Sequence, residues 1–174
     1  MEKWIYSFNK SIDEIENPSE LLGNKGAGLN LMTGLDLPVP QGFTILTKLN
    51  HYFQKNKSFP DEFENELIKN IFNLEKISNC KFGSSTNPLL LSVRSGSQKS
   101  MPGMLDTILN IGFNRKVLDF YEKQNKPLFA WDTWRRFLHM FSHVVYKIEH
   151  FYFDEILDSY LSVSYTHLTL PTNA

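Results

Sequence analysis

Short apolar runs and longer amphipathic stretches alternate along the chain, which predicts a mixture of strands and helices. The apolar or β-branched runs are typical of strands and cover residues 4–8, 43–46, 89–93 and 105–111. Of these, residues 89–93 are the most apolar, so we expect a mostly buried strand there. We expect the strands to share one mixed sheet, whose order the pattern does not determine.

Helical spacing of apolar residues predicts the remaining elements. Residues 24–35, 47–53, 60–74, 114–124 and 127–148 each repeat apolar residues on one face. The acids of the third stretch are interpreted as a solvated face; they are Asp61, Glu62, Glu64 and Glu66. The fold class is therefore expected to be α+β, with the sheet flanked by helices.

Composition narrows the class of protein. A chain of 174 residues with 41% hydrophobic residues is long enough for one domain with a core. A net charge of -1 and no long basic run argue against nucleic-acid or membrane binding driven by bulk charge. Cys80 is the only cysteine, so a disulfide framework and a thiolate metal site are excluded. With no signal-like N-terminus and no run of membrane-spanning length, we expect a cytoplasmic protein.

The stretch from residue 89 to 112 carries the clearest candidate chemistry. The apolar run ends in Arg94 and Ser95, a loop follows with Gly103 and Met104, and Thr107 lies in the next strand. Guanidinium, hydroxyl and backbone N–H groups suit phosphate oxygens, and glycine lets the backbone approach them. The alternative is that Arg94 is a surface charge and the glycines only shape a hairpin. The residues alone leave both interpretations open.

A second candidate lies at the start of the helix predicted over residues 24–35. Lys25 stands among Gly23, Gly26 and Gly28, where free helix N–H groups and the positive end of the helix dipole suit an anion. The segment lacks the Gly-Lys-Ser/Thr ending of a P-loop and the third glycine of a dinucleotide fingerprint. A glycine-shaped helix start with a solvated Lys25 is the alternative.

The longest predicted helix adds a candidate cation and three histidines. Arg136 lies beside Trp134 and could point into the same pocket as Arg94, although a surface ion pair explains it equally well. His139, His143 and His150 have spacings that could present imidazoles to a metal, but no acidic or cysteine partner completes a site. We interpret them as structural or surface histidines and predict no metal site.

Two blocks of the sequence resemble the N-terminal ATP-binding region of pyruvate, phosphate dikinases. They are SVRSGSQKSMPGMLDTILNIG (residues 92–112) and LLGNKGAGLNLMTGLDLPVPQGFTI (residues 21–45), and the resemblance extends over about residues 4–153. The pairing of MPGM with DT favours a dikinase over the related phosphoenolpyruvate synthases. Gly28 departs slightly from the family pattern, because the family usually has a polar residue at this position.

The resemblance implies the first part of an ATP-grasp-like domain. It implies that Lys25 and Arg94 bind the ATP phosphates, and that Gly103, Met104 and Thr107 lie in the loop and strand that close over them. With Ser95 and Arg136, which are candidates from their own chemistry, these residues make up the predicted ATP-binding set. The resemblance also implies an enzyme that converts ATP, phosphate and pyruvate to AMP, pyrophosphate and phosphoenolpyruvate through a mobile phosphohistidine. Magnesium neutralises the phosphates in such a reaction, and the parent enzyme is expected to be a homodimer.

Other parts of that enzyme have no counterpart in the sequence. The Gly-Gly-Thr-Ser-His motif, the acidic magnesium ligands and the pyruvate-binding barrel are missing, so no catalytic residue is assigned. We therefore predict an N-terminal fragment over residues 1–161 that does not catalyse alone. Residues 162–174 are uncharged and threonine-rich, and are interpreted as a non-native or disordered tail. The alternatives are a stand-alone nucleotide-binding module and a fragment of a related dikinase or synthase with another acceptor.

Overall fold

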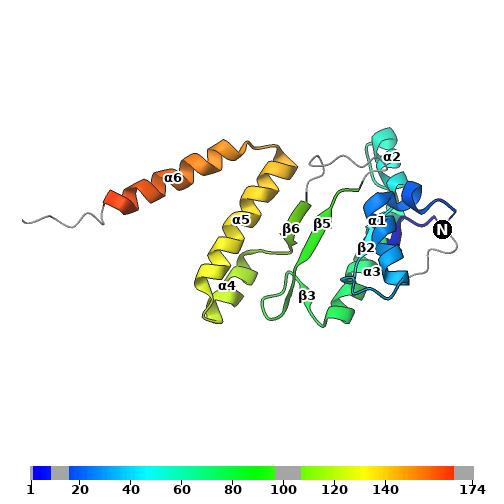
Figure 1. The fold of residues 1–174 in the computed structure, drawn as a ribbon, viewed down its shortest axis with the longest axis horizontal. Helices are drawn as coiled ribbons and strands as arrows, with labels where there is room; N and C mark the ends of the chain where they lie inside the picture. Colours follow the sequence, from blue (N-terminus) through cyan, green and yellow to red (C-terminus); the bar gives the residue numbers. More distant parts are fainter. Residues whose placement is uncertain (1, 9–15, 97–106, 167–174) are drawn as a thin grey trace, which may run out of the picture.

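The fold joins two helix-rich halves, seen at the two sides of Figure 1. It was obtained as a computed structural model, which describes residues 2–8, 16–96 and 107–166, with side chains to residue 161. The elements of the N-terminal half are β1 (Ile5–Ser7), α1 (Pro18–Gly34), β2 (Phe43–Ile45), α2 (Thr47–Asn56) and α3 (Asp61–Ser78). Those that follow are β3 (Lys81–Phe82), β4 (Pro88–Leu89), β5 (Leu91–Arg94), β6 (Thr107–Ile111), α4 (Arg115–Lys123), α5 (Pro127–Tyr146) and α6 (His150–Thr166).

The strands form separate pairs rather than the single sheet predicted from the sequence. β1 pairs with β2 and β5 pairs with β6, both antiparallel, whereas β3 and β4 are parallel. The run at residues 89–93 is divided at Leu90, so β4 and β5 pair with different neighbours. The mixed helix and strand content confirms the α+β class, but the prediction of one mixed sheet is wrong for the described residues.

The N-terminal half is organised around an aromatic core. Trp4 and Ile5 of the first strand segment are buried with Leu49 of α2 and Phe63 of α3. The carboxylate of Glu66 links this strand to α3, because it accepts hydrogen bonds from the backbone N–H groups of Trp4 (2.8 Å) and Ile5 (3.2 Å). The interpretation of the α3 acids as a solvated face is therefore wrong for Glu66.

The second half has its own core between α4 and α5. Phe113, Val117, Leu118 and Ala130 are buried there, and Trp134 packs against them. The start of α4 is fixed by Asn114. Its side-chain oxygen accepts the N–H of Val117 at 3.1 Å, and its amide nitrogen donates to the carbonyl of Gly83 at 3.2 Å. This cap joins α4 to the turn that follows β3.

The strand that ends in Arg94 is more exposed than the sequence predicts. Val93 has 50% of its surface accessible, and β5 pairs with one strand, β6, within the described residues. The prediction of a mostly buried strand is therefore wrong here, because the described elements leave part of β5 uncovered.

Helices α1 and α6 differ from what the sequence predicts. α1 begins at Pro18, and Gly23 interrupts it with φ 71° and ψ 164°, a conformation essentially restricted to glycine. The second part of α1 starts after this kink, where the sequence predicts a helix to begin. α6 continues to Thr166, into the segment interpreted as a tail, and residues 167–174 lie outside the described residues. In the part of the chain that the structure describes, no helix is both long and apolar enough to cross a membrane.

Candidate functional site

Arg94 and Thr107 face each other across the antiparallel pair of β5 and β6. Their Cα atoms are partners in the register, directly before and after the segment that joins the two strands. Two residues of the predicted phosphate site, Gly103 and Met104, belong to that segment and lie outside the described residues. The structure thus places Arg94 and Thr107 at the two ends of the predicted loop.

The two sequence blocks meet at Gly96 and Leu22. A Cβ atom built on Gly96 would lie 3.9 Å from the carbonyl oxygen of Leu22, although the two residues are far apart in the sequence. Leu22 is buried at the end of the first part of α1, and Lys25 follows it by three positions. The chain that leaves β5 after Arg94 therefore passes beside the turn of α1 that precedes Lys25.

Close packing of α1 on β2 fixes this turn. A Cβ atom on Gly26 would lie 2.8 Å from Oγ1 and 2.9 Å from Cγ2 of Thr44, and 3.1 Å from Cβ of Leu22. These distances leave no room for a larger residue unless Thr44 or the helix itself moves. Gly28, in contrast, has open space at its Cβ position. Gly26 and Gly28 therefore differ: the close packing of α1 on β2 requires a glycine at position 26 but not at position 28.

The cations at this place are open to ligands. Lys25 and Arg94 are exposed, and none of the residues that the structure describes forms an ion pair with either. Ser95 is exposed and Thr107 is half-buried. Two cationic side chains on neighbouring segments, without an anionic partner among these residues, form a surface that suits a polyphosphate.

Arg136 forms a surface ion pair, which is one of the two interpretations that the sequence allows. Its Nε donates to Oδ2 of Asp132 at 2.7 Å, and 70% of its side chain is accessible. Arg135 also bonds to Asp132, at 3.0 Å, and the two guanidinium groups hold the pKa of that carboxyl below its usual value despite some desolvation. The predicted contact of Arg136 with ATP remains a prediction.

The three histidines gather where α5 meets α6. Nε2 of His139 lies 2.6 Å from Nδ1 of His150, and the rings of His143 and His150 stack with centroids 3.7 Å apart. Nδ1 of His143 lies 2.9 Å from the carbonyl oxygen of Ile148. Burial lowers the pKa of His139, and the charge of a protonated His150 lowers it further. These contacts assign the histidines a place in the packing of α6 on α5.

Acidic and histidine side chains form no candidate metal centre in the described ranges. Within residues 2–8, 16–96 and 107–161, no group of three or more His, Cys, Asp or Glu side chains could hold a metal ion. The resemblance implies that the magnesium ligands lie outside this chain. We therefore assign no magnesium ligand to the described residues.

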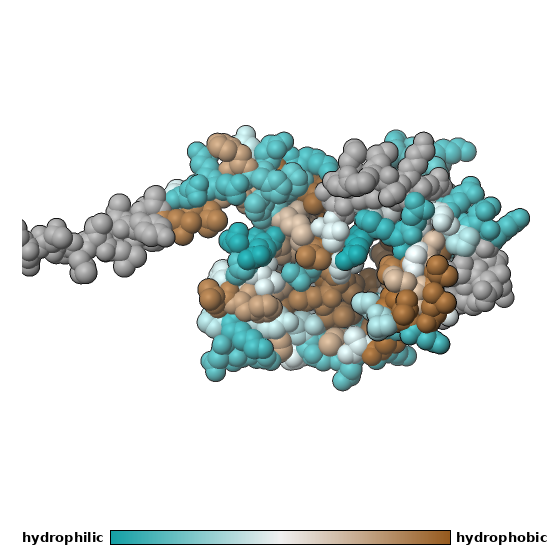
Figure 2. Space-filling model, in the orientation of Figure 1, coloured by the Kyte–Doolittle hydropathy of each residue, from teal (hydrophilic) through white to brown (hydrophobic). Residues whose placement is uncertain are grey.

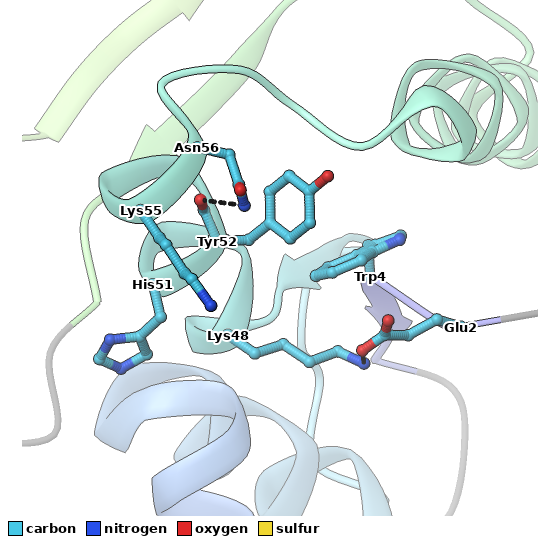
Figure 3. A pocket seen from close by; sticks show the side chains of 7 residues that line it. All are labelled: Glu2, Trp4, Lys48, His51, Tyr52, Lys55 and Asn56. Atoms are coloured by element: carbon cyan, nitrogen blue, oxygen red, sulfur yellow. Dashed lines mark hydrogen bonds and ion pairs between the residues drawn. The ribbon is translucent and has the colours of Figure 1, made fainter.

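A surface hollow of about 440 Å³ lies apart from the predicted phosphate site (Figure 3). Helix α2 contributes Lys48, His51 and Lys55 to one side, and Trp4 and Glu2 line the other. The ammonium of Lys48 pairs with Glu2 at 2.9 Å and lies 4.7 Å from the ring centre of Trp4. No motif in the sequence distinguishes these residues. The only signal was the helical spacing of the three basic side chains.

Comparison with curated proteins finds relatives over most of the chain. The dikinase of Rickettsia prowazekii is 49% identical over 164 residues, which are 92% of this chain and 19% of the relative. That of Clostridium symbiosum is 42% identical over 161 residues, 91% of this chain and 18% of the relative. That of Entamoeba histolytica is 44% identical over 157 residues, 89% of this chain and 17% of the relative. No protein-family model matches the chain.

The chain is therefore homologous to one segment of a family of much longer enzymes. Those enzymes are pyruvate, phosphate dikinases, so the resemblance seen in the two sequence blocks is confirmed. The chain spans about a fifth of the length of the relatives that it matches.

Proposed function

We propose that this chain is the N-terminal part of a pyruvate, phosphate dikinase and binds the phosphates of ATP. The observation that carries the proposal is an identity of 42–49% to such enzymes along about nine-tenths of the chain. In the proposed parent reaction, ATP, phosphate and pyruvate give AMP, pyrophosphate and phosphoenolpyruvate. Magnesium, held by ligands outside this chain, would neutralise the phosphate charge.

The geometry around Gly96 supports a shared phosphate site. Lys25 supplies a mobile point charge and Arg94 a planar fork of donors, which are complementary means of holding a polyphosphate. Ser95 and Thr107 add hydroxyl groups beside Arg94. Gly103, Met104 and Arg136 complete the proposed set; for the first two, the proposal rests on the resemblance of the sequence block that contains them. We assign the whole to the first part of an ATP-grasp-like domain.

The isolated chain is proposed to be inactive. Phosphoryl transfer needs a nucleophile in line with the phosphate and metal ions that neutralise the developing charge. The chain is proposed to supply neither, since the resemblance assigns the phosphohistidine, the metal ligands and the pyruvate site to other parts of the enzyme. The chain then acts by holding and orienting one substrate.

A hybrid enzyme tests this proposal. This chain would replace the matched segment of the Rickettsia prowazekii dikinase, and phosphoenolpyruvate would be measured with ATP, phosphate and pyruvate. We expect activity in the hybrid and none in the isolated chain. Arg94→Ala in the hybrid should remove most of the activity, whereas Arg115→Ala, which breaks a distant ion pair with Asp119, should not.

A folded hybrid without activity would contradict the proposal. If the isolated chain nevertheless binds ATP through Arg94, the result would favour a stand-alone nucleotide-binding module. If the hybrid phosphorylates its histidine but forms no phosphoenolpyruvate, a parent enzyme with another acceptor would be favoured.

A further inference from the structure

Helix α6 carries a continuous apolar stripe. Tyr152, Ile156 and Tyr160 recur every fourth residue, and Leu157 and Leu161 extend the stripe beside them. Ile156 is 58% exposed and Tyr160 is 72% exposed. The other face of the helix carries the charged residues Asp154, Glu155 and Asp158. This division into faces is typical of a helix that packs against another element.

The described part of the chain does not cover this stripe. Figure 1 shows α6 leaving the end of α5 and extending away from the two halves of the molecule. Its contacts with α5 lie at its start, where His150 meets His139 and the ring of Phe153 stacks on that of His139 at 4.5 Å. Hydrophobic residues also reach the surface over α5 and β6, as Figure 2 shows. Contiguous exposed apolar surface of this kind marks an interaction site.

The relatives indicate what covers it. The chain accounts for 19% of the length of the Rickettsia prowazekii dikinase, and the rest of that enzyme has no counterpart here. We propose that the apolar stripe of α6 is a docking face for dikinase polypeptide outside the matched segment. This inference rests on the proposed function, because it takes the chain to be part of a longer enzyme.

The charges of α6 argue against a membrane as the occupant. Helices that lie on anionic membranes carry Lys and Arg on their polar face. From His150 to Leu161, α6 carries three acids and neither Lys nor Arg. A protein surface with an apolar groove and basic residues at its rim would complement both faces of the helix.

Thiol reactivity tests the docking face. Ile156→Cys on the stripe and Asp158→Cys on the charged face would each be made in the isolated chain and in the hybrid dikinase. Cys80→Ser removes the native thiol, and its hydroxyl can replace the Cys80 contact with Asn87. We expect the thiol of the Ile156→Cys variant to react with a maleimide at least about tenfold more slowly in the hybrid than in the isolated chain. The thiol of the Asp158→Cys variant should react at similar rates in both.

Several outcomes would overturn the inference. One is equal reactivity of the Ile156→Cys thiol in the hybrid and the isolated chain; another is equal protection of the thiols of both variants. Protection of the Ile156→Cys thiol that rises with the concentration of the isolated chain would assign the stripe to a second copy instead. If the hybrid does not fold, a cysteine at the position aligned with Ile156 in the Rickettsia prowazekii dikinase replaces it, and an accessible thiol there refutes the inference. Phosphoenolpyruvate formation by the hybrid tests the proposed function separately.

Discussion

Gly96 lies against the carbonyl of Leu22, and this approach joins two blocks that the sequence separates. The strand end that carries Arg94 and the helix turn that precedes Lys25 are thereby held side by side. Neither block explains anion binding convincingly alone, since each has a simple structural interpretation. Their meeting places two exposed cations on adjoining backbone segments, which is an arrangement that suits a polyphosphate.

Removal of either cation should weaken ATP binding by the hybrid dikinase. Lys25→Ala and Arg94→Ala each remove a charge-assisted hydrogen bond, which contributes about 1.5–3 kcal/mol. We therefore expect each to raise the dissociation constant of ATP about tenfold or more. Arg94→Lys should give an intermediate value, because lysine keeps the charge but loses the planar fork. Titration calorimetry would measure the constants.

Lys57→Ala is the matched control, because Lys57 is an exposed cation at the end of α2. It should leave the ATP affinity within about twofold of the parent value, as expected for an exposed charge away from the site. Equal losses in all three alanine variants would show that only the net charge matters. The site would then have to be assigned elsewhere.

The two glycines beside Lys25 should respond differently to alanine. Gly26→Ala places a methyl group 2.8 Å from Oγ1 of Thr44, so it should destabilise the fold by about 1–3 kcal/mol. Gly28→Ala meets open space within a helix and should stabilise by about 0.5–1 kcal/mol. Urea unfolding of the two variants would measure the difference. Similar changes in both would show that α1 does not pack on β2 as described.

The sequence predicted the helices and strands well where their positions depend on the local pattern of apolar residues. The strands at Ile5–Ser7 and Phe43–Ile45 and the helix at Pro127–Tyr146 lie where hydrophobic periodicity placed them. The prediction from local pattern is wrong at residues 89–93, where one apolar run contains parts of two strands that pair with different partners. Strand pairing depends on distant segments, so a local pattern does not contain it.

The candidate residues could be chosen from the sequence, but the tertiary contact that brings their segments together could not be predicted. Arg94 and Lys25 could be selected from their chemistry and their neighbours. The approach of the backbone segments that carry them depends on the contact of Gly96 with Leu22, a tertiary contact without a periodic signal. The role of Glu66 was missed for the same reason, because its partners are backbone groups about sixty positions earlier in the chain.

Glu66→Ala should destabilise the N-terminal half of the molecule. The change removes the acceptor of two backbone N–H groups on a strand that is largely buried, at a cost of about 1.5–3 kcal/mol. Glu66→Gln keeps one acceptor and should cost less. Glu64→Ala, an exposed acid on the same helix, should change stability by less than about 0.5 kcal/mol. Urea unfolding followed by circular dichroism would measure the loss, and equal effects at positions 64 and 66 would contradict the assignment.

The packing of α6 on α5 should weaken in mild acid. Burial and His150 lower the pKa of His139 in the folded chain below its ordinary value of 6.5. His143 and Arg135 on α5 act in the same direction, whereas Asp154 on α6 opposes them. The unfolded chain therefore binds the proton more readily, so the free energy of unfolding falls as pH decreases from 7 through the lowered pKa. Above pH 7 the histidine is neutral in both states and makes no contribution.

Thermal unfolding between pH 5 and 8 would measure this dependence. In His139→Gln the fall in stability below pH 7 should be smaller than in the parent chain, because the group that resists protonation is gone. His51→Gln, on α2 and away from the α5–α6 junction, should retain the parent profile. Hydrogen exchange in the first turns of α6 should quicken in acid in the parent but less so in His139→Gln, since protonation of His139 is disfavoured where its Nε2 lies 2.6 Å from Nδ1 of His150. Identical pH profiles for the parent and His139→Gln would show that His139 does not control the junction.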